Sequence, residues 1–195
     1  MARGLDELYV VLEDYKKLFA WAVAISIMPF AASLSELAPP WPKQIAAVTA
    51  IAQLAVLLLV FQIFRNSPKR VVNRIVVASF LALFSLSAIY IVVLLGFTFQ
   101  LSGTSERMVR GFYCTQIAQA SYPAKCPLLG ADEMNEAGYV ASRLWTNGSI
   151  VMVHVTLVTI WTAAFTALAL LVGSFAIFQQ RKMPLRSHQK GQQLG

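Results

Sequence analysis

The chain has 195 residues, of which 57% are hydrophobic and only 13% are charged, and its formal net charge is +7. A soluble domain of this length needs more polar surface than this composition provides, so an ordinary soluble protein is excluded. The apolar residues are instead bunched into runs, and about 20 consecutive apolar residues are needed to cross the roughly 30 Å of hydrocarbon in a bilayer.

Four such runs predict four transmembrane helices, at about residues 18–35, 44–64, 75–99 and 149–178, and none contains Asp, Glu, Lys or Arg. Backbone polar groups in lipid must be satisfied within the segment, which favours helices. The first run contains Pro29, but the acidic residues that precede it argue against a cleaved signal peptide. The sequence therefore predicts an all-α integral membrane protein whose transmembrane domain covers residues 18–178.

The ends of the chain and the first connection are read from composition. Residues 1–17 predict an amphipathic helix at the cytoplasmic interface, and residues 179–195 predict a flexible basic cytoplasmic tail. Between the first two helices, Pro39, Pro40 and Pro42 interrupt helix and predict a stiff hairpin. Trp41 is expected at the level of the lipid head groups.

The connection at residues 100–148 is long enough to have its own structure, and we expect a small extracytoplasmic helical cap. Cys114 and Cys126 are the only cysteines and both lie here, which favours a structural disulfide worth about 2–3 kcal/mol. A redox-active pair is the alternative, although such pairs are normally closer together. The stretch SERMVRGFYC predicts an outward extension of the third helix, and ADEMNEAGYVASRLW predicts a helix that leads into the fourth.

The distribution of basic residues sets the expected orientation. Eleven of the 16 Lys and Arg residues lie at the two termini and in the connection between the second and third helices. We therefore place both termini in the cytoplasm and expect these side chains to contact lipid head groups rather than nucleic acid. The residues assigned to this role are Arg65, Lys69, Arg70, Arg74, Arg181 and Lys182.

Polar residues within the apolar runs are costly against lipid and should face neighbouring helices. We expect Gln53 and Gln62 to form hydrogen bonds between helices, with a pore lining as the alternative. His154 is expected to pack at an interface rather than to act as a pH sensor or a ligand. A series of threonines in the fourth helix predicts close helix packing or, in an oligomer, a narrow polar pathway; its members are Thr156, Thr159, Thr162 and Thr166.

The sequence shows no phosphate-binding glycine loop, no H-E-x-x-H and no catalytic triad, so we expect no enzyme activity, cofactor or metal site. It favours a small polytopic subunit that acts by homo-oligomerisation and partner binding, including a cytoplasmic partner, as a sensor or a membrane-perturbing effector. Small four-helix subunits of bacterial antiviral systems have the same outline, which is an analogy of architecture. An oligomeric ion channel or transporter component is the alternative. The short loops favour a bacterial inner membrane.

Overall fold

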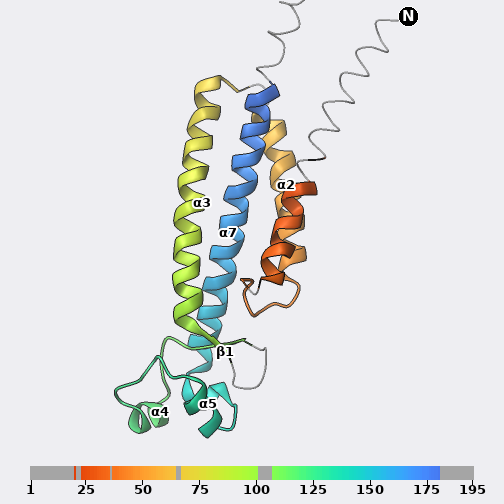
Figure 1. Ribbon diagram of the computed structural model, residues 1–195. Coiled ribbons are helices and arrows are strands. Elements are labelled where there is room, and N and C mark those ends of the chain that lie inside the picture. Colours follow the sequence, from red (N-terminus) through yellow and green to blue (C-terminus); the bar gives the residue numbers. More distant parts are fainter. Residues whose placement is uncertain (1–19, 21–22, 36, 65–66, 101–106, 181–195) are drawn as a thin grey trace, which may run out of the picture. The chain divides into compact units, whose positions relative to one another are not determined.

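The computed structural model describes residues 20, 23–35, 37–64, 67–100 and 107–180 (Figure 1). Three helices in this part are long and apolar enough to cross a membrane, namely α2 (Ile45–Phe64), α3 (Lys69–Phe97) and α7 (Asn147–Gln180). A shorter apolar helix covers Val23–Leu34. The first predicted run, 18–35, lies partly outside the described residues. Residues 1–17 and most of the basic tail lie entirely outside them.

The starts of two helices follow from proline positions. Pro42 lies just before α2, and its carbonyl accepts a hydrogen bond from the Ile45 N–H at 3.0 Å. Pro68 precedes α3, and its carbonyl accepts from the N–H groups of Val71 and Val72. Proline suits the first turn of a helix because its missing N–H would have no partner there in any case.

The chain divides into two compact units, each described here by itself. In the first, α2 packs against the later part of α7. Gly173 makes this approach possible, since a Cβ at this position would lie 2.9 Å from the Val60 side chain and 3.2 Å from that of Leu57. Thr49 and Gln53 are buried on α2 together with Leu57 and Val60. Other large apolar side chains of α2 remain exposed, as expected for contact with lipid; they are Val48, Ile51, Leu54, Leu58, Leu59 and Ile63.

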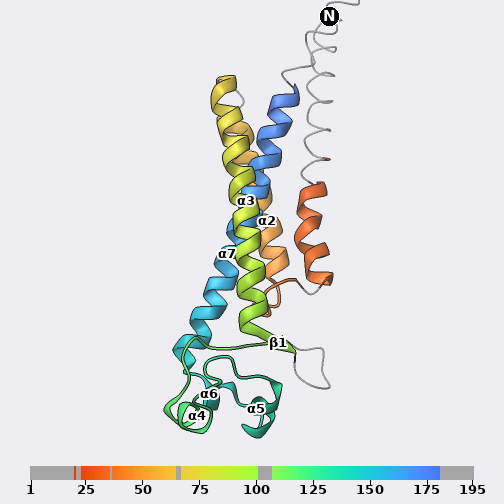
Figure 2. The same cartoon turned by 60° about the vertical axis from the view of Figure 1, so that its left-hand side comes forward.

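The second unit holds Leu37–Ile45 and Phe84–Ala164, which include the later half of α3, the connection between α3 and α7, and the first half of α7. The connection contains a two-stranded antiparallel sheet, β1 (Thr98–Gln100) with β2 (Arg107–Val109). Three short helices follow: α4 (Gln116–Ser121), α5 (Ala131–Glu136) and α6 (Ala141–Leu144). Figures 1 and 2 both show these elements gathered at the start of α7. We call the described residues 98–100 and 107–146 the disulfide module.

Two expectations about this connection are wrong. The third helix does not extend outward, because the chain leaves α3 at Phe97 and pairs Phe99 with Met108 as a β-ladder. At the open end of this hairpin, the Arg110 N–H donates a hydrogen bond to the Phe97 carbonyl at 2.8 Å. The single helix expected before α7 is broken into α5 and α6 by Gly138 and Tyr139, whose φ values of 70° and 62° end a right-handed helix.

Candidate functional site

The disulfide module is built around one indole. Trp145 is fully buried, and its Nε1–H donates to the Pro127 carbonyl at 2.9 Å. Leu129 and Met134 are also fully buried in the same cluster. A buried tryptophan needs both apolar neighbours and an acceptor for its N–H, and α5 and the residues just before it supply these. The residue therefore fixes two stretches of chain that are distant in sequence.

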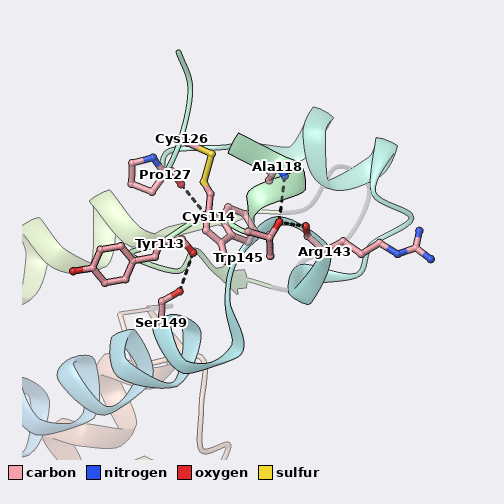
Figure 3. The surroundings of a disulfide bond; sticks show 9 residues. Tyr113, Cys114, Ala118, Cys126, Pro127, Arg143, Trp145 and Ser149 are labelled. Atoms are coloured by element: carbon pink, nitrogen blue, oxygen red, sulfur yellow. Dashed lines mark hydrogen bonds between the residues drawn. A yellow bond between two sulfur atoms is a disulfide. The ribbon is translucent and has the colours of Figure 1, made fainter. Parts of the chain in front are cut away.

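The two cysteines form a disulfide beside this indole, with their Cα atoms 6.2 Å apart (Figure 3). Cys114 also forms an isolated β-bridge with Trp145. The next residue, Thr115, caps α4: its Oγ1 accepts from the Ala118 N–H at 3.2 Å and donates to the Arg143 carbonyl at 2.6 Å. The disulfide thus lies on the packed core of the module, which agrees with a structural bridge.

A close backbone approach joins the module to the first turn of α7. A Cβ placed on Gly111 would lie 2.2 Å from Ser149 Oγ and 2.7 Å from Trp145 Cβ, so only glycine fits. The Ser149 hydroxyl is buried within hydrogen-bonding distance of the Tyr113 and Thr146 carbonyls, at 3.2 and 2.9 Å. These contacts place the module directly on the start of α7.

Arg110 closes the end of α3. Its Nη1 donates to the Gly96 carbonyl at 3.1 Å, and its guanidinium lies 5.2 Å from the centre of the Phe99 ring. The last carbonyls of a helix lack partners within the helix, and a cation there also opposes the helix dipole. Burial lowers the pKa of Arg110, partly offset by the charge of Glu133, but an arginine stays protonated in a protein.

An ion pair closes the other side of the module. Lys125 Nζ lies 2.5 Å from Glu133 Oε1, and the Gly130 N–H donates to Glu133 Oε2 at 2.8 Å. The hydrogen bond from Lys125, followed by that from Gly130, lowers the pKa of Glu133 to about 2. The Tyr122 hydroxyl also donates to Glu136. Glu133 therefore caps the start of α5 and also forms an ion pair with Lys125, which directly precedes the bridged Cys126.

The two glutamines of α2 lie in different surroundings. Gln53 is buried, and its Nε2 donates to the Phe165 carbonyl of α7 at 3.3 Å. Its Oε1 is buried and has no hydrogen-bond partner in the described part of the chain. Gln62 is exposed, two residues before α2 ends, where a carboxamide can reach the head-group layer. The structure thus places Gln53 between two helices and Gln62 near a helix end.

The predicted polar residues of α7 do not gather at one point. His154 is half-buried, with Nδ1 3.0 Å from the Ile150 carbonyl, and its ring meets the Trp41 ring edge-on at 5.9 Å. The hydroxyls of Thr156 and Thr162 donate to carbonyls four residues earlier in their own helix. Thr159 is exposed and Thr166 is half-buried. The hydroxyls of Thr156 and Thr162 therefore already have acceptors within α7.

The basic residues predicted at the head groups are described only in part. Lys69, Arg70 and Arg74 lie in the first turns of α3, and all three are exposed. Arg65, Arg181 and Lys182 lie outside the described residues. Within the residues that the structure describes, no group of three His, Cys, Asp or Glu side chains is placed to hold a metal ion.

Four residues that organise the module were not singled out from sequence: Trp145, Gly111, Arg110 and Tyr113. Trp145 stands just before the fourth apolar run, where a tryptophan is equally typical of a membrane interface. A glycine gives no sign of which atoms approach it. No family model matches the sequence, and no curated protein or solved structure matches it either.

Proposed function

We propose that this chain is a small polytopic membrane subunit that acts by assembly, with the disulfide module as its contact surface. In this proposal the helix Val23–Leu34 and the residues before it complete a fourth span. The disulfide module is then an extracytoplasmic cap, and the termini lie in the cytoplasm with most of the basic residues. Cysteine pairing in an oxidising compartment and the placement of Lys and Arg support this orientation.

The observation that carries the proposal is the surface of the module around its disulfide. Ile117 is 78% exposed and Leu128 is 58% exposed, and each follows a bridged cysteine within three residues. The same module buries Trp145, Leu129 and Met134 completely. Large apolar side chains that stay outside a well-packed core, when they gather in one region, are typical of a surface that binds another protein. We assign that surface to a second copy of this chain.

The experiment measures the mass of the full-length protein in nanodiscs, alone and as the variants Ile117→Ser and Leu128→Ser. We expect a defined oligomer for the wild type and a shift toward the monomer for both variants. Val140→Ser is the matched control, because Val140 is an exposed apolar residue of the same module that is distant in sequence from both cysteines. A monomeric wild type, or the same mass in all four proteins, contradicts assembly through this surface.

An oligomeric channel is the second candidate, and the buried carboxamide of Gln53 favours it. An unpaired buried amide oxygen costs about 1–3 kcal/mol, and a water or an ion that passes between the helices would satisfy it. Ion flux into liposomes tests this directly, with Gln53→Leu as the variant and the exposed Gln62→Leu as the matched control. Flux that falls only in Gln53→Leu supports a channel, and an absence of flux in the wild type rejects it.

A further inference from the structure

Two helices of this protein, α3 and α7, are longer than the hydrocarbon layer of a bilayer. At 1.5 Å per residue, the 34 residues of α7 span about 51 Å, whereas the hydrocarbon core is about 30 Å thick. The 29 residues of α3 span about 44 Å on the same basis. Apolar length alone therefore does not fix how deeply these helices sit, and their depth depends on side chains at the interface.

Two exposed aromatic side chains flank the first turns of α7. Trp41, from the proline-rich connection, is 58% exposed and its ring meets His154 edge-on. The Tyr90 hydroxyl of α3 holds the start of this connection by donating to the Leu37 carbonyl at 2.6 Å. Trp41 is therefore presented to the surroundings at the level of His154 by contacts with both α3 and α7.

Tyr113, from the disulfide module, is the second aromatic residue, and 70% of it is exposed. Its carbonyl accepts from the Thr146 N–H at 3.0 Å and lies 3.2 Å from Ser149 Oγ, so its backbone is fixed to the start of α7. In Figure 3 the ring points away from the disulfide and from Trp145, toward the side of the view into which α7 runs. Tyr113 thus faces the surroundings of the helices rather than the core of the module.

The α7 residues that contact Tyr113 and Trp41 lie about as far apart along the helix axis as one interfacial layer of the bilayer is thick. Ser149 and His154 are five residues apart, which corresponds to about 7.5 Å along the helix axis. A bilayer of about 40–45 Å with a hydrocarbon core of about 30 Å leaves an interfacial layer of about 5–7 Å on each side. Tyr and Trp have an apolar ring and one polar group, and they are enriched in this layer for that reason.

We propose that Trp41 and Tyr113 form one lipid-contacting anchor that fixes the depth of α7 and seats the disulfide module on the head-group layer. The occupant of this surface is the glycerol and ester region of the leaflet on the side of the module. In this proposal Tyr113 contacts lipid although it lies in the disulfide module. The surface that contains Ile117 and Leu128 contacts protein instead. The inference rests on the membrane insertion in the proposed function and is independent of assembly.

The test uses tryptophan emission of the full-length protein in nanodiscs made with phosphatidylcholine that is brominated near the ester end of its acyl chains, because bromine quenches an indole on contact. The variant Tyr113→Trp places a new indole at the proposed anchor. Tyr139→Trp is the matched control, since Tyr139 is 49% exposed and lies between α5 and α6 of the same module, distant in sequence from Tyr113. Discs of unbrominated lipid give the reference emission for each protein, and an intact disulfide, verified by mass, shows that the module has folded.

We expect bromination to remove the emission that Tyr113→Trp adds and to leave the emission that Tyr139→Trp adds. A second measurement uses Trp41→Phe, which should lose quenchable emission relative to the wild type. If the indole introduced by Tyr113→Trp is not quenched, or is quenched no more than that at position 139, the anchor is rejected. Shielding of Tyr113→Trp from bromine only in the oligomeric fraction identifies a protein contact and also rejects the anchor. Failed insertion into discs contradicts the membrane proposal itself.

Discussion

At the scale of single residues, Glu133 has the most clearly defined chemistry. Its carboxylate accepts from Lys125 Nζ and from the Gly130 N–H, and these hydrogen bonds favour the ionised form. The pKa of Glu133 is therefore lowered from 4.5 to about 2 in the folded protein. A carboxyl group whose folded pKa lies below its unfolded pKa stabilises the protein above the unfolded value.

The acid stability of the module should follow from this shift. The stabilisation by Glu133 should be complete above about pH 4.5 and should be lost as the pH falls toward 2. We expect Glu133→Gln to lower the melting temperature of the module at neutral pH and to flatten its dependence on pH in that window. Near-ultraviolet circular dichroism, which reports on the packing of Trp145, gives the measurement. Asp132→Asn, at the exposed neighbouring position, should keep the wild-type pH dependence, and an equal effect of both variants contradicts the assignment.

Some of these residues were predictable and others were not. The pairing of Cys114 with Cys126 follows from their number and their place in one connection. The roles of Gly111 and Trp145 depend on contacts with residues up to 38 positions away in the chain, which no local pattern encodes. For Gln53, the pattern predicts burial between helices, but it gives no sign that one amide oxygen stays without a partner in the described chain.

At the scale of elements, the long helices were more predictable than the connection. The expected spans 44–64, 75–99 and 149–178 correspond closely to α2, α3 and α7, because the thickness of a bilayer imposes a minimum apolar length that is visible in sequence. The β-hairpin was missed because Thr98 and Phe99 continue an apolar run that also fits a helix. Its strands are stabilised by pairing across a gap in the sequence, which local propensity does not determine.

The disulfide offers a test of how independently these elements fold. Replacement of both Cys114 and Cys126 by Ser should lower the free energy of unfolding of the module by about 2–3 kcal/mol, since the bridge closes a loop of about a dozen residues. The helical signal in far-ultraviolet circular dichroism should remain, because α2, α3 and α7 contain no cysteine. Denaturant titration of the Trp145 environment measures the loss. Unchanged stability of the module, or a collapse of the helical signal, contradicts this prediction.

At the scale of the whole molecule, the number of spans determines where the termini lie. The helix Val23–Leu34 has a length of about 18 Å, so it crosses the bilayer only if the helix continues through the residues before it. An even number of spans places both termini on one side, and three spans place them on opposite sides. The sequence predicts four spans.

Epitope tags at the two termini, tested for protease access in spheroplasts and in inverted vesicles, measure this directly. We expect both tags to be protected in spheroplasts and cleaved in inverted vesicles, because the positively charged segments favour the cytoplasm. The control is a tag inserted after Gly138, in the exposed turn between α5 and α6, which should show the opposite pattern. Termini on opposite sides of the membrane would mean that Val23–Leu34 does not cross it.

Two backbone hydrogen bonds within the connection between α3 and α7 determine where this connection can accept additional residues. The chain leaves at Phe97 and returns to it at Arg110, and it leaves again at Tyr113 and returns at Thr146, each time through a backbone hydrogen bond. The two ends of each excursion therefore lie within hydrogen-bonding distance of each other. Doubling the length of a flexible loop whose ends are held in this way costs only about 0.6 kcal/mol. Extra residues inserted at an exposed turn of either excursion should therefore leave Phe97, Tyr113 and the long helices in place.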